Sequence, residues 1–224
     1  NSPISGSETF VKVLILGGNG QMGPHVITSL QGRHDLRVTD ISPVPPGFKH
    51  EYRVLDVSDH DGVIDAARGM DEIINLSVAR EHRRIAWDVN LRGNYSVAVA
   101  AAHHDIQRIV NTGPYYQVAG RTYDDFDFGL QPDMPPQPGT VMYALTKALG
   151  HEVLRIYSER HDLYVQTLLF YQMRDPGSCS GKETNEKGGT GQDMIPPYII
   201  AWPDAGLAVR AALEVNYSQL PTRC

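Results

Sequence analysis

Short aliphatic runs alternate along the chain with longer stretches in which apolar residues recur at helical spacing. The short runs are typical of buried parallel strands, and the longer stretches are typical of helices that pack on a sheet. We expect strands at 11–16, Leu36–Asp40, Tyr52–Asp56, Glu72–Leu76, Arg108–Thr112 and Leu163–Phe170, and helices after Gly23 and at Gly62–Gly69, Ala86–His103, Val141–Arg160 and Asp204–Val215. This order predicts a parallel α/β sheet with helices on its faces.

Three segments lack this pattern. Residues 1–9 are polar, and we expect a flexible leader at residues 1–10. Residues 120–140 are rich in Asp, Pro and Gly and predict a long loop, which inside a compact domain is usually functional. Gly, Ser, Lys and Glu dominate residues 174–193, where we expect a mobile flap.

The turn between the first strand and the first helix carries glycines at Gly17, Gly20 and Gly23. Such glycines let the backbone turn sharply and approach a pyrophosphate, while the new helix offers free N–H groups and the positive end of its dipole. A glycine triplet alone is weak evidence, but its place between a strand and a helix favours a dinucleotide site. The pattern therefore predicts a Rossmann-type, doubly wound sheet.

The second predicted strand ends at Asp40, 23 positions after Gly17. A carboxylate at this spacing can accept hydrogen bonds from the hydroxyls of an adenosine ribose. It would repel a 2′-phosphate, and neither Ile41 nor Ser42 supplies a compensating positive charge. We therefore expect NAD rather than NADP; the alternative is an ordinary solvated aspartate.

Composition narrows the class of protein. Hydrophobic residues make up 41% of the 224 residues and charged residues 21%, which suits a globular protein with one sizeable core. A net charge of −6 argues against nucleic acid as the main partner, and no apolar run is long enough to span a membrane. The cysteines Cys179 and Cys224 lie far apart, which suggests a reducing, cytoplasmic compartment. Nine histidines form no chelating pair at helical spacing, so we expect no metal.

One dense positive cluster is present, formed by Arg80, His82, Arg83 and Arg84. It could hold an anionic group of a substrate, or it could be the solvated start of a helix.

Tyr143 and Lys147 lie four positions apart in a predicted helix and share one face of it. A nearby cation favours phenolate over phenol and lowers the pKa of a tyrosine. Tyr143 could then remove the proton of a substrate hydroxyl while hydride leaves the carbon, and Lys147 could also bond the nicotinamide ribose. Such a pair is common by chance, but it gains weight after a dinucleotide motif.

Together these motifs resemble the extended short-chain dehydrogenase/reductase superfamily, in its NAD-dependent epimerase/dehydratase group. The resemblance covers roughly residues 11–215, and the order of the motifs is more specific than any one of them. It is carried by the glycine turn, Asp40, Asp56-Val57, Leu76-Ser-Val-Ala79, Asn90-Leu-Arg-Gly-Asn94, Tyr143-x-x-x-Lys147 and Ile200-Ala-Trp-Pro-Asp204.

The resemblance implies a role for each matching position. Tyr143 and Lys147 would be the catalytic base and its helper, with Thr112 as a further catalytic residue. The expected cofactor-binding residues are Gly17, Asn19, Gly20, Gln21, Met22, Gly23, Asp40, Ile41, Asp56, Val57, Leu76, Ser77, Val78, Asn90, Tyr143, Lys147 and Tyr171 with its neighbours Gln172 and Met173.

The chain departs from the family pattern in three places. Tyr115 stands where the family places a Ser or Thr after the fifth strand; Thr112 is the nearest hydroxyl of that type, and Tyr115 or Tyr116 could substitute. The connection between Ala79 and Asn90 is short for the group. The region after the sixth strand is also much smaller than the lobe that grips a nucleotide-sugar in larger members.

We therefore expect a leader at 1–10, an NAD-binding Rossmann domain at 11–170, and at 171–224 a reduced C-terminal substrate lobe interleaved with the last sheet elements. The predicted function is NAD-dependent hydride transfer at a secondary alcohol of a small sugar, sugar acid or similar polyol. The alternatives are a nucleotide-sugar epimerase or dehydratase, and a catalytically silent NAD-binding regulatory or scaffold protein. Ala98–Ala102 is a packing stripe that could join two helices in a homodimer.

Overall fold

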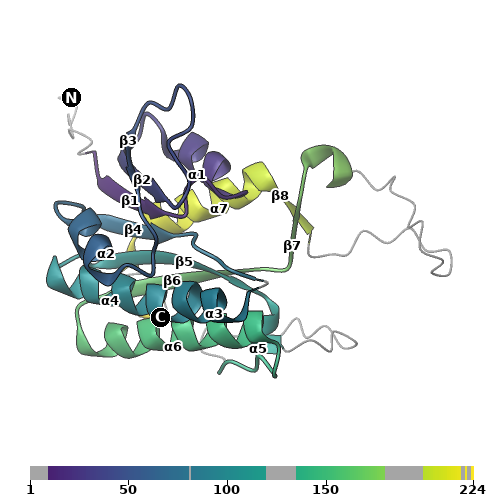
Figure 1. The fold of residues 1–224 in the computed structure, drawn as a ribbon. Coiled ribbons are helices and arrows are strands. Elements are labelled where there is room, and N and C mark those ends of the chain that lie inside the picture. The colour runs from purple at the N-terminus through teal and green to yellow at the C-terminus, as the bar shows by residue number, and fades with distance from the viewer. Residues whose placement is uncertain (1–9, 81, 120–134, 180–198, 218–219, 221–222) are drawn as a thin grey trace, which may run out of the picture.

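The computed structural model describes residues 10–80, 82–119, 135–179, 199–217, 220 and 223–224. Its centre is a six-stranded sheet in which every pair of neighbouring strands is parallel, with the order β3-β2-β1-β4-β5-β6 (Figure 1). The strands are β1 (Lys12–Leu16), β2 (Asp35–Asp40), β3 (Glu51–Val54), β4 (Glu72–Asn75), β5 (Arg108–Pro114) and β6 (Tyr164–Phe170). All six predicted strands are present, and the predicted doubly wound α/β fold is confirmed.

Helices cover both faces of this sheet. Helices α1 (Gly23–Leu30) and α7 (Trp202–Glu214) form one layer, and α2 (His60–Ala67), α4 (Gly93–His103) and α6 (Met142–Arg160) form the other (Figure 1). Each layer buries its own apolar cluster against the sheet, because β1 and β4 carry aliphatic side chains on both faces. Helix α7 lies beyond the boundary predicted for the Rossmann domain, so the C-terminal part of the chain contributes to the sheet layers.

The predicted helix Ala86–His103 is divided into three pieces. A short helix α3 (Arg83–Ala86) leads into a π-helical segment η1 (Trp87–Arg92), and α4 continues from Gly93. Within α4, Ala98, Ala100 and Ala101 are fully buried in the core of this chain. They therefore cannot form the surface of the dimer contact that we expected from the alanine stripe.

Several short elements escape the hydrophobic pattern. These are α5 (Tyr116–Ala119), β7 (Gln172–Arg174), a 3-10 helix η2 (Pro176–Cys179) and β8 (Ile199–Ala201). Strands β7 and β8 pair in parallel as a small second sheet. Arg174, the first residue of the expected flap, ends β7, and η2 follows it. The rest of the expected flap, residues 180–193, lies outside the described residues, as do residues 1–9 of the leader and 120–134 of the long loop.

The order of the strands creates a crevice at the centre of the sheet. The chain builds outward from β1 to β3 and then returns to place β4 on the other side of β1. The loops after β1 and β4 therefore diverge, which in open α/β sheets is where ligands bind. In the described part of the chain, no helix has both the length and the apolar character needed to cross a membrane.

Candidate active site

The glycine turn occupies this crevice. Gly17 has a φ of +76°, which favours glycine, and a Cβ there would lie 2.9 Å from the backbone nitrogen of Ser77. A Cβ at Gly23 would lie 1.9 Å from the Gly18 oxygen, so this glycine lets α1 start directly against the turn. A Cβ at Gly20 would lie 3.3 Å from the Gly17 oxygen, and Gly20 lines a cavity. Gly17 and Gly23 thus permit close backbone packing, and Gly17 and Gly20 both line the cavity.

The Asp40 side chain is tied to the same turn. One carboxylate oxygen accepts a hydrogen bond from the backbone N–H of Asn19, and the other accepts one from Ser42, each at 3.0 Å. These bonds hold the carboxylate at the C-terminal end of β2, beside the start of α1. Ile41, also predicted to touch the cofactor, is 69% exposed next to it. The structure thus brings Asp40 and the glycine turn together, as the sequence predicts.

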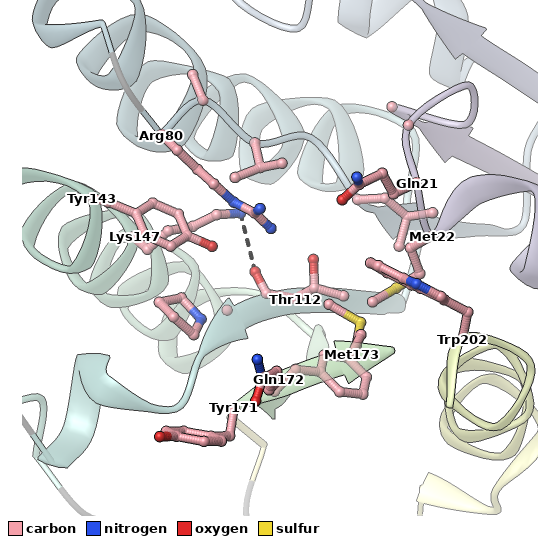
Figure 2. Close-up of a pocket in the computed structure, with 18 of the residues that line it drawn as sticks. Gln21, Met22, Arg80, Thr112, Tyr143, Lys147, Tyr171, Gln172, Met173 and Trp202 are labelled. Carbon is pink, nitrogen blue, oxygen red and sulfur yellow. Dashed lines mark hydrogen bonds between the residues drawn. The ribbon is translucent and has the colours of Figure 1, made fainter. Parts of the chain in front are cut away.

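A cavity of about 680 Å³ opens beside the turn (Figure 2). Its walls come from both sides of the crevice, and among the predicted site residues they include Gly17, Gly20, Gln21, Met22, Leu76, Val78, Thr112, Tyr143, Lys147, Tyr171, Gln172 and Met173. Arg80, His82, Phe170 and Trp202 line it as well and were not among the predicted site residues. The cavity size is ordinary for a site that takes small molecules.

Lys147 is held at the floor of the cavity. Its ammonium donates hydrogen bonds to the backbone oxygens of Ser77, at 2.8 Å, and of Thr112, at 3.1 Å. The side chain is almost completely buried, and this burial, together with the charge of Arg80, lowers the pKa of Lys147 to about 7. Lys147 therefore joins the loop after β4 to β5 directly beneath the cavity.

Tyr143 lies one helical turn before Lys147 and faces the same cavity (Figure 2). Burial raises the pKa of its phenol, and the charge of Arg80 and a hydrogen bond from its guanidinium oppose that rise. The guanidinium carbon of Arg80 lies 5.6 Å from the centre of the Tyr143 ring. The phenol, an arginine and a lysine therefore converge on one wall.

The hydroxyl of Thr112 points into the sheet as well as toward the cavity. It donates to the backbone oxygen of Asn75 at 3.2 Å, and its oxygen keeps lone pairs for a further donor. Tyr115 is largely buried, with its ring 6.3 Å from that of Tyr171, and is not among the residues that line the cavity. Of these two candidates for the family's Ser/Thr position, Thr112 is the one that reaches the cavity.

Other predicted cofactor residues lie outside the cavity wall. Asn90 is fully buried, and its side chain bonds Ala79 and Thr146 instead of facing a ligand. The Asp56 carboxylate accepts from the Ser58 backbone at 2.9 Å. Val57 is buried against Gly93, where a Cβ would lie 2.9 Å from its methyl group. Asn90 therefore does not face the cavity itself; it supports the site by holding the Ala79 backbone, in the loop after β4, against Thr146 of α6.

The positive cluster of the sequence is split by the structure. Arg80 and His82 line the cavity, whereas Arg84 is exposed on α3 and pairs with Asp88 at 3.8 Å. The cluster was thus the sequence signal for Arg80, but nothing in the sequence indicates which arginine faces inward. In the described part of the chain, no group of three or more His, Cys, Asp or Glu side chains could hold a metal ion.

Comparison with known proteins agrees with this geometry. Residues 13–187 match the NAD dependent epimerase/dehydratase family, and the chain belongs to this family. The resemblance seen in the sequence is therefore confirmed, and so is, at the level of the family, the prediction of an NAD-dependent enzyme.

The individual relatives are more distant. The L-arabinose 1-dehydrogenase (NAD(P)(+)) of Haloferax volcanii is 28% identical over 94% of this chain and 85% of its own length. Uronate dehydrogenase from Agrobacterium tumefaciens is 22% identical with a TM-score of 0.70, over 95% of this chain and 73% of that chain. A short-chain dehydrogenase/reductase superfamily protein of Agrobacterium tumefaciens with bound NAD is 24% identical with a TM-score of 0.64, over 73% of this chain; this chain spans 50% of that one. The two structures show the fold that the three proteins share.

Proposed function

We propose that this protein is an NAD-dependent oxidoreductase that transfers hydride at a secondary alcohol of a small sugar, sugar acid or similar polyol. The observation that carries the proposal is the convergence of Tyr143, Lys147 and Thr112 on the cavity into which the glycine turn opens. The relatives named as dehydrogenases of arabinose and of uronate support oxidation of a free sugar over epimerisation or dehydration.

The residues fit the cofactor on two grounds. Gly20 lines the cavity beside the start of α1, whose N-cap Met22 makes no side-chain cap, and the positive end of the helix dipole there suits a pyrophosphate. Asp40 is fixed where it can accept bonds from ribose hydroxyls. NAD bound there would supply a nicotinamide ring that accepts hydride from the substrate carbon.

The chain's own residues then handle the proton and the position of the substrate. The ionised Tyr143 oxygen takes the proton of the substrate hydroxyl, while the C–H electron pair leaves with the hydride and the carbon becomes a carbonyl. The Thr112 hydroxyl donates its own hydrogen to the Asn75 oxygen, so its oxygen can accept a bond from a neighbouring hydroxyl of the polyol and thereby orient the substrate. Lys147 holds the Ser77 and Thr112 backbones in place, and its remaining N–H can reach a ribose hydroxyl.

The test is a screen of pentoses, hexoses, uronic acids and short polyols with NAD, following the absorbance of the reduced nicotinamide. We expect turnover with at least one of them and a loss of about 100-fold or more in kcat for Tyr143→Phe, since the variant lacks the base. Tyr157→Phe, on the same helix but outside the cavity wall, is the matched control and should keep its activity.

Three outcomes would separate the proposal from its alternatives. Activity that survives Tyr143→Phe would remove this residue from the mechanism. NAD binding without turnover of any compound would favour a regulatory or scaffold protein. Reduced cofactor that stays bound through a complete turnover would favour an epimerase or a dehydratase.

We also infer that the protein is a homodimer, joined through α4 and α6. Tyr95 on α4 and Leu149 and Ile156 on α6 are large apolar residues that stay exposed on this layer. The charged side chains nearby on α6 largely neutralise one another, because Arg155 forms ion pairs with Glu152 and Glu159. This stretch of α6 therefore brings little net charge against a second copy. A cytoplasmic location stays a prediction from the sequence.

A further inference from the structure

We propose that the indole of Trp202 packs against the nicotinamide ring of NAD and favours the oxidised form of that ring. The inference deepens the proposed function and rests on it, because it takes NAD as the hydride acceptor in this cavity. The sequence pointed to Trp202 only as part of the stretch Ile200-Ala-Trp-Pro-Asp204 and assigned it no task.

The first support is the place of Trp202 in the cavity wall. Trp202 is the first residue of α7 and lines the cavity, as does Met22 beside the glycine turn. In Figure 2 the indole reaches toward Met22 and Met173, at the side of the cavity away from Tyr143. A dinucleotide whose pyrophosphate lies at the turn has to carry its nicotinamide across the cavity toward Tyr143. This path starts at the wall that Trp202 forms.

The second support is the chemistry of this wall. Met22, Phe170 and Met173 line the cavity together with Trp202, and all four belong to the apolar cluster beneath α1 and α7. Aromatic rings pack favourably against one another in offset or edge contacts, and methionine sulfur adds favourable contacts with ring edges. This wall therefore suits a flat aromatic ring, whereas the hydroxyl of Thr112, which suits a polyol, lies on β5.

The third support is how the structure holds the indole. The imidazole of His25, on α1, lies nearly parallel to it, with the ring centres 6.2 Å apart and the planes inclined by 13°. Gly206 lets the two helices approach, because a Cβ there would lie 2.6 Å from the His25 oxygen, and the Ser29 hydroxyl donates to the Gly206 oxygen at 3.0 Å. The indole is thus fixed before a ligand binds, and a fixed contact group loses little conformational entropy on binding.

The charge of the nicotinamide decides which form of NAD this contact favours. The oxidised ring carries a positive charge, and it becomes neutral when it accepts hydride. Among the aromatic side chains, Trp attracts a cation most strongly through the face of its ring. Trp202 therefore favours oxidised over reduced NAD, which suits an enzyme that oxidises an alcohol.

The test compares the binding of three ligands by titration calorimetry. These are oxidised NAD, reduced NAD, and ADP-ribose, which keeps the pyrophosphate but lacks the nicotinamide. The proteins are the parent, Trp202→Phe, Trp202→Leu and Trp87→Leu. Trp87 is the matched control, because it is 40% exposed on η1 and is not among the residues that line the cavity.

We expect Trp202→Leu to weaken the binding of oxidised NAD about fivefold more than that of reduced NAD, which is the size of a cation–π contact at a partly exposed site. Trp202→Phe keeps an aromatic ring and should change this ratio less. The binding of ADP-ribose should be the same in all four proteins, which also shows that the rest of the site is intact. Trp87→Leu should bind all three ligands like the parent.

A second measurement leaves Trp202 in place, so it does not depend on whether a variant of this packed residue folds. The sequence has two tryptophans, so Trp87→Phe makes Trp202 the sole source of indole fluorescence. Oxidised NAD should quench this fluorescence strongly, whereas ADP-ribose should leave it nearly unchanged.

A ratio of the two NAD affinities that stays as in the parent in Trp202→Leu would overturn the inference. So would an equal weakening of ADP-ribose, or Trp202 fluorescence that bound NAD does not quench. Each of these results would leave the proposed function standing if the parent oxidised an alcohol with NAD. Conversely, the expected change of ratio in a protein that turns over no alcohol would support the contact between Trp202 and nicotinamide and count against the proposed function.

Discussion

The Asp40 carboxylate shows how one residue links the fold to the choice of cofactor. Both of its oxygens are held by backbone N–H groups, from Asn19 in the glycine turn and from Ser42 after β2. A carboxylate fixed in this way cannot swing aside for a phosphate on the ribose. Arg37, the nearest basic residue along β2, is bonded to the Ala66 and Arg68 backbones and to Glu51. It is therefore not free to pair with such a phosphate.

We predict that Asp40→Asn narrows the preference for NAD over NADP by about tenfold or more, because close like charges cost several kcal/mol and about 1.4 kcal/mol corresponds to tenfold. Dissociation constants for both cofactors, measured by titration calorimetry, check this. Asp35→Asn, at the opposite end of β2, removes the same charge and should leave both constants unchanged. Tighter binding of NADP than of NAD by the parent protein would contradict the prediction.

At this scale the sequence predicts well wherever a residue acts through its backbone position. The glycine turn, Asp40, Tyr143 and Lys147 lie where their spacing placed them, because strand ends and helical turns fix such positions. The sequence indicated Arg80 only as one of four clustered basic residues. The direction of its side chain depends on the loop after β4, which the Asn90 side chain holds by two hydrogen bonds to the Ala79 backbone. The hydrogen bond of Thr112 to the Asn75 oxygen is likewise a tertiary contact that spacing cannot reveal.

Among the elements, the π-helical segment η1 shows why a helix can be predicted while its shape cannot. Residues 86–103 are rich in Ala and Val, and this pattern is the same for an α-helix and for one that widens by a residue. In the widened segment the Asn90 backbone oxygen accepts a hydrogen bond from the side-chain amide of Asn94, at 2.6 Å. It also places Asn90 against α6, at Gly150.

Gly150 is the position at which this contact can be tested. A Cβ there would lie 2.2 Å from the Asn90 oxygen and 2.7 Å from the Asn94 amide nitrogen, so α6 and η1 would have to move apart. We predict that Gly150→Ala lowers the free energy of unfolding by about 1–3 kcal/mol, despite the better helix propensity of Ala. Urea denaturation measures this, and kcat should fall as well because Lys147 lies on the same helix.

The control for this prediction is Gly177→Ala, where no described atom lies within 4 Å of the added Cβ. It should leave the unfolding free energy nearly unchanged. A Gly150→Ala protein as stable as the parent would show that α6 and η1 are less tightly packed than the structure has them.

The shortest elements were missed for a different reason. Strands β7 and β8 have three residues each, too few for an alternating pattern, and what positions them is tertiary: they pair with each other, and Met173 and Ile200 pack against the apolar cluster beneath α1 and α7. Sequence periodicity therefore predicts the six-stranded sheet and its helices but not this second sheet. Because Gln172 and Met173 of β7 line the cavity, the missed element is the one that closes the site on that side.

For the whole molecule, the strand order explains how distant segments form one site. The return of the chain from β3 to β4 opens the crevice in which the glycine turn, the loop after β4, the end of β5, helix α6 and the segment after β6 meet. The chain carries a net charge of −6, yet the described lining of this cavity includes Arg80 and Lys147 and no acidic side chain. This part of the cavity is therefore positive in a chain of net negative charge, which favours anionic groups there.

The outer face of the α4–α6 layer gives the last prediction, on assembly. Leu149 and Ile156 are 37% and 46% exposed and lie two helical turns apart on α6. A two-fold axis would place the same patch of a second copy against these two residues, so that each copy buries the exposed apolar side chains of the other.

We predict that the parent is a dimer by light scattering coupled to size-exclusion chromatography. The double variant Leu149→Glu with Ile156→Glu should be a folded monomer, because like charges would face each other across the axis. Leu207→Glu, at a residue 44% exposed on α7 in the opposite layer, should remain a dimer. A monomeric parent, or a double variant that stays dimeric, would rule out this face as the interface.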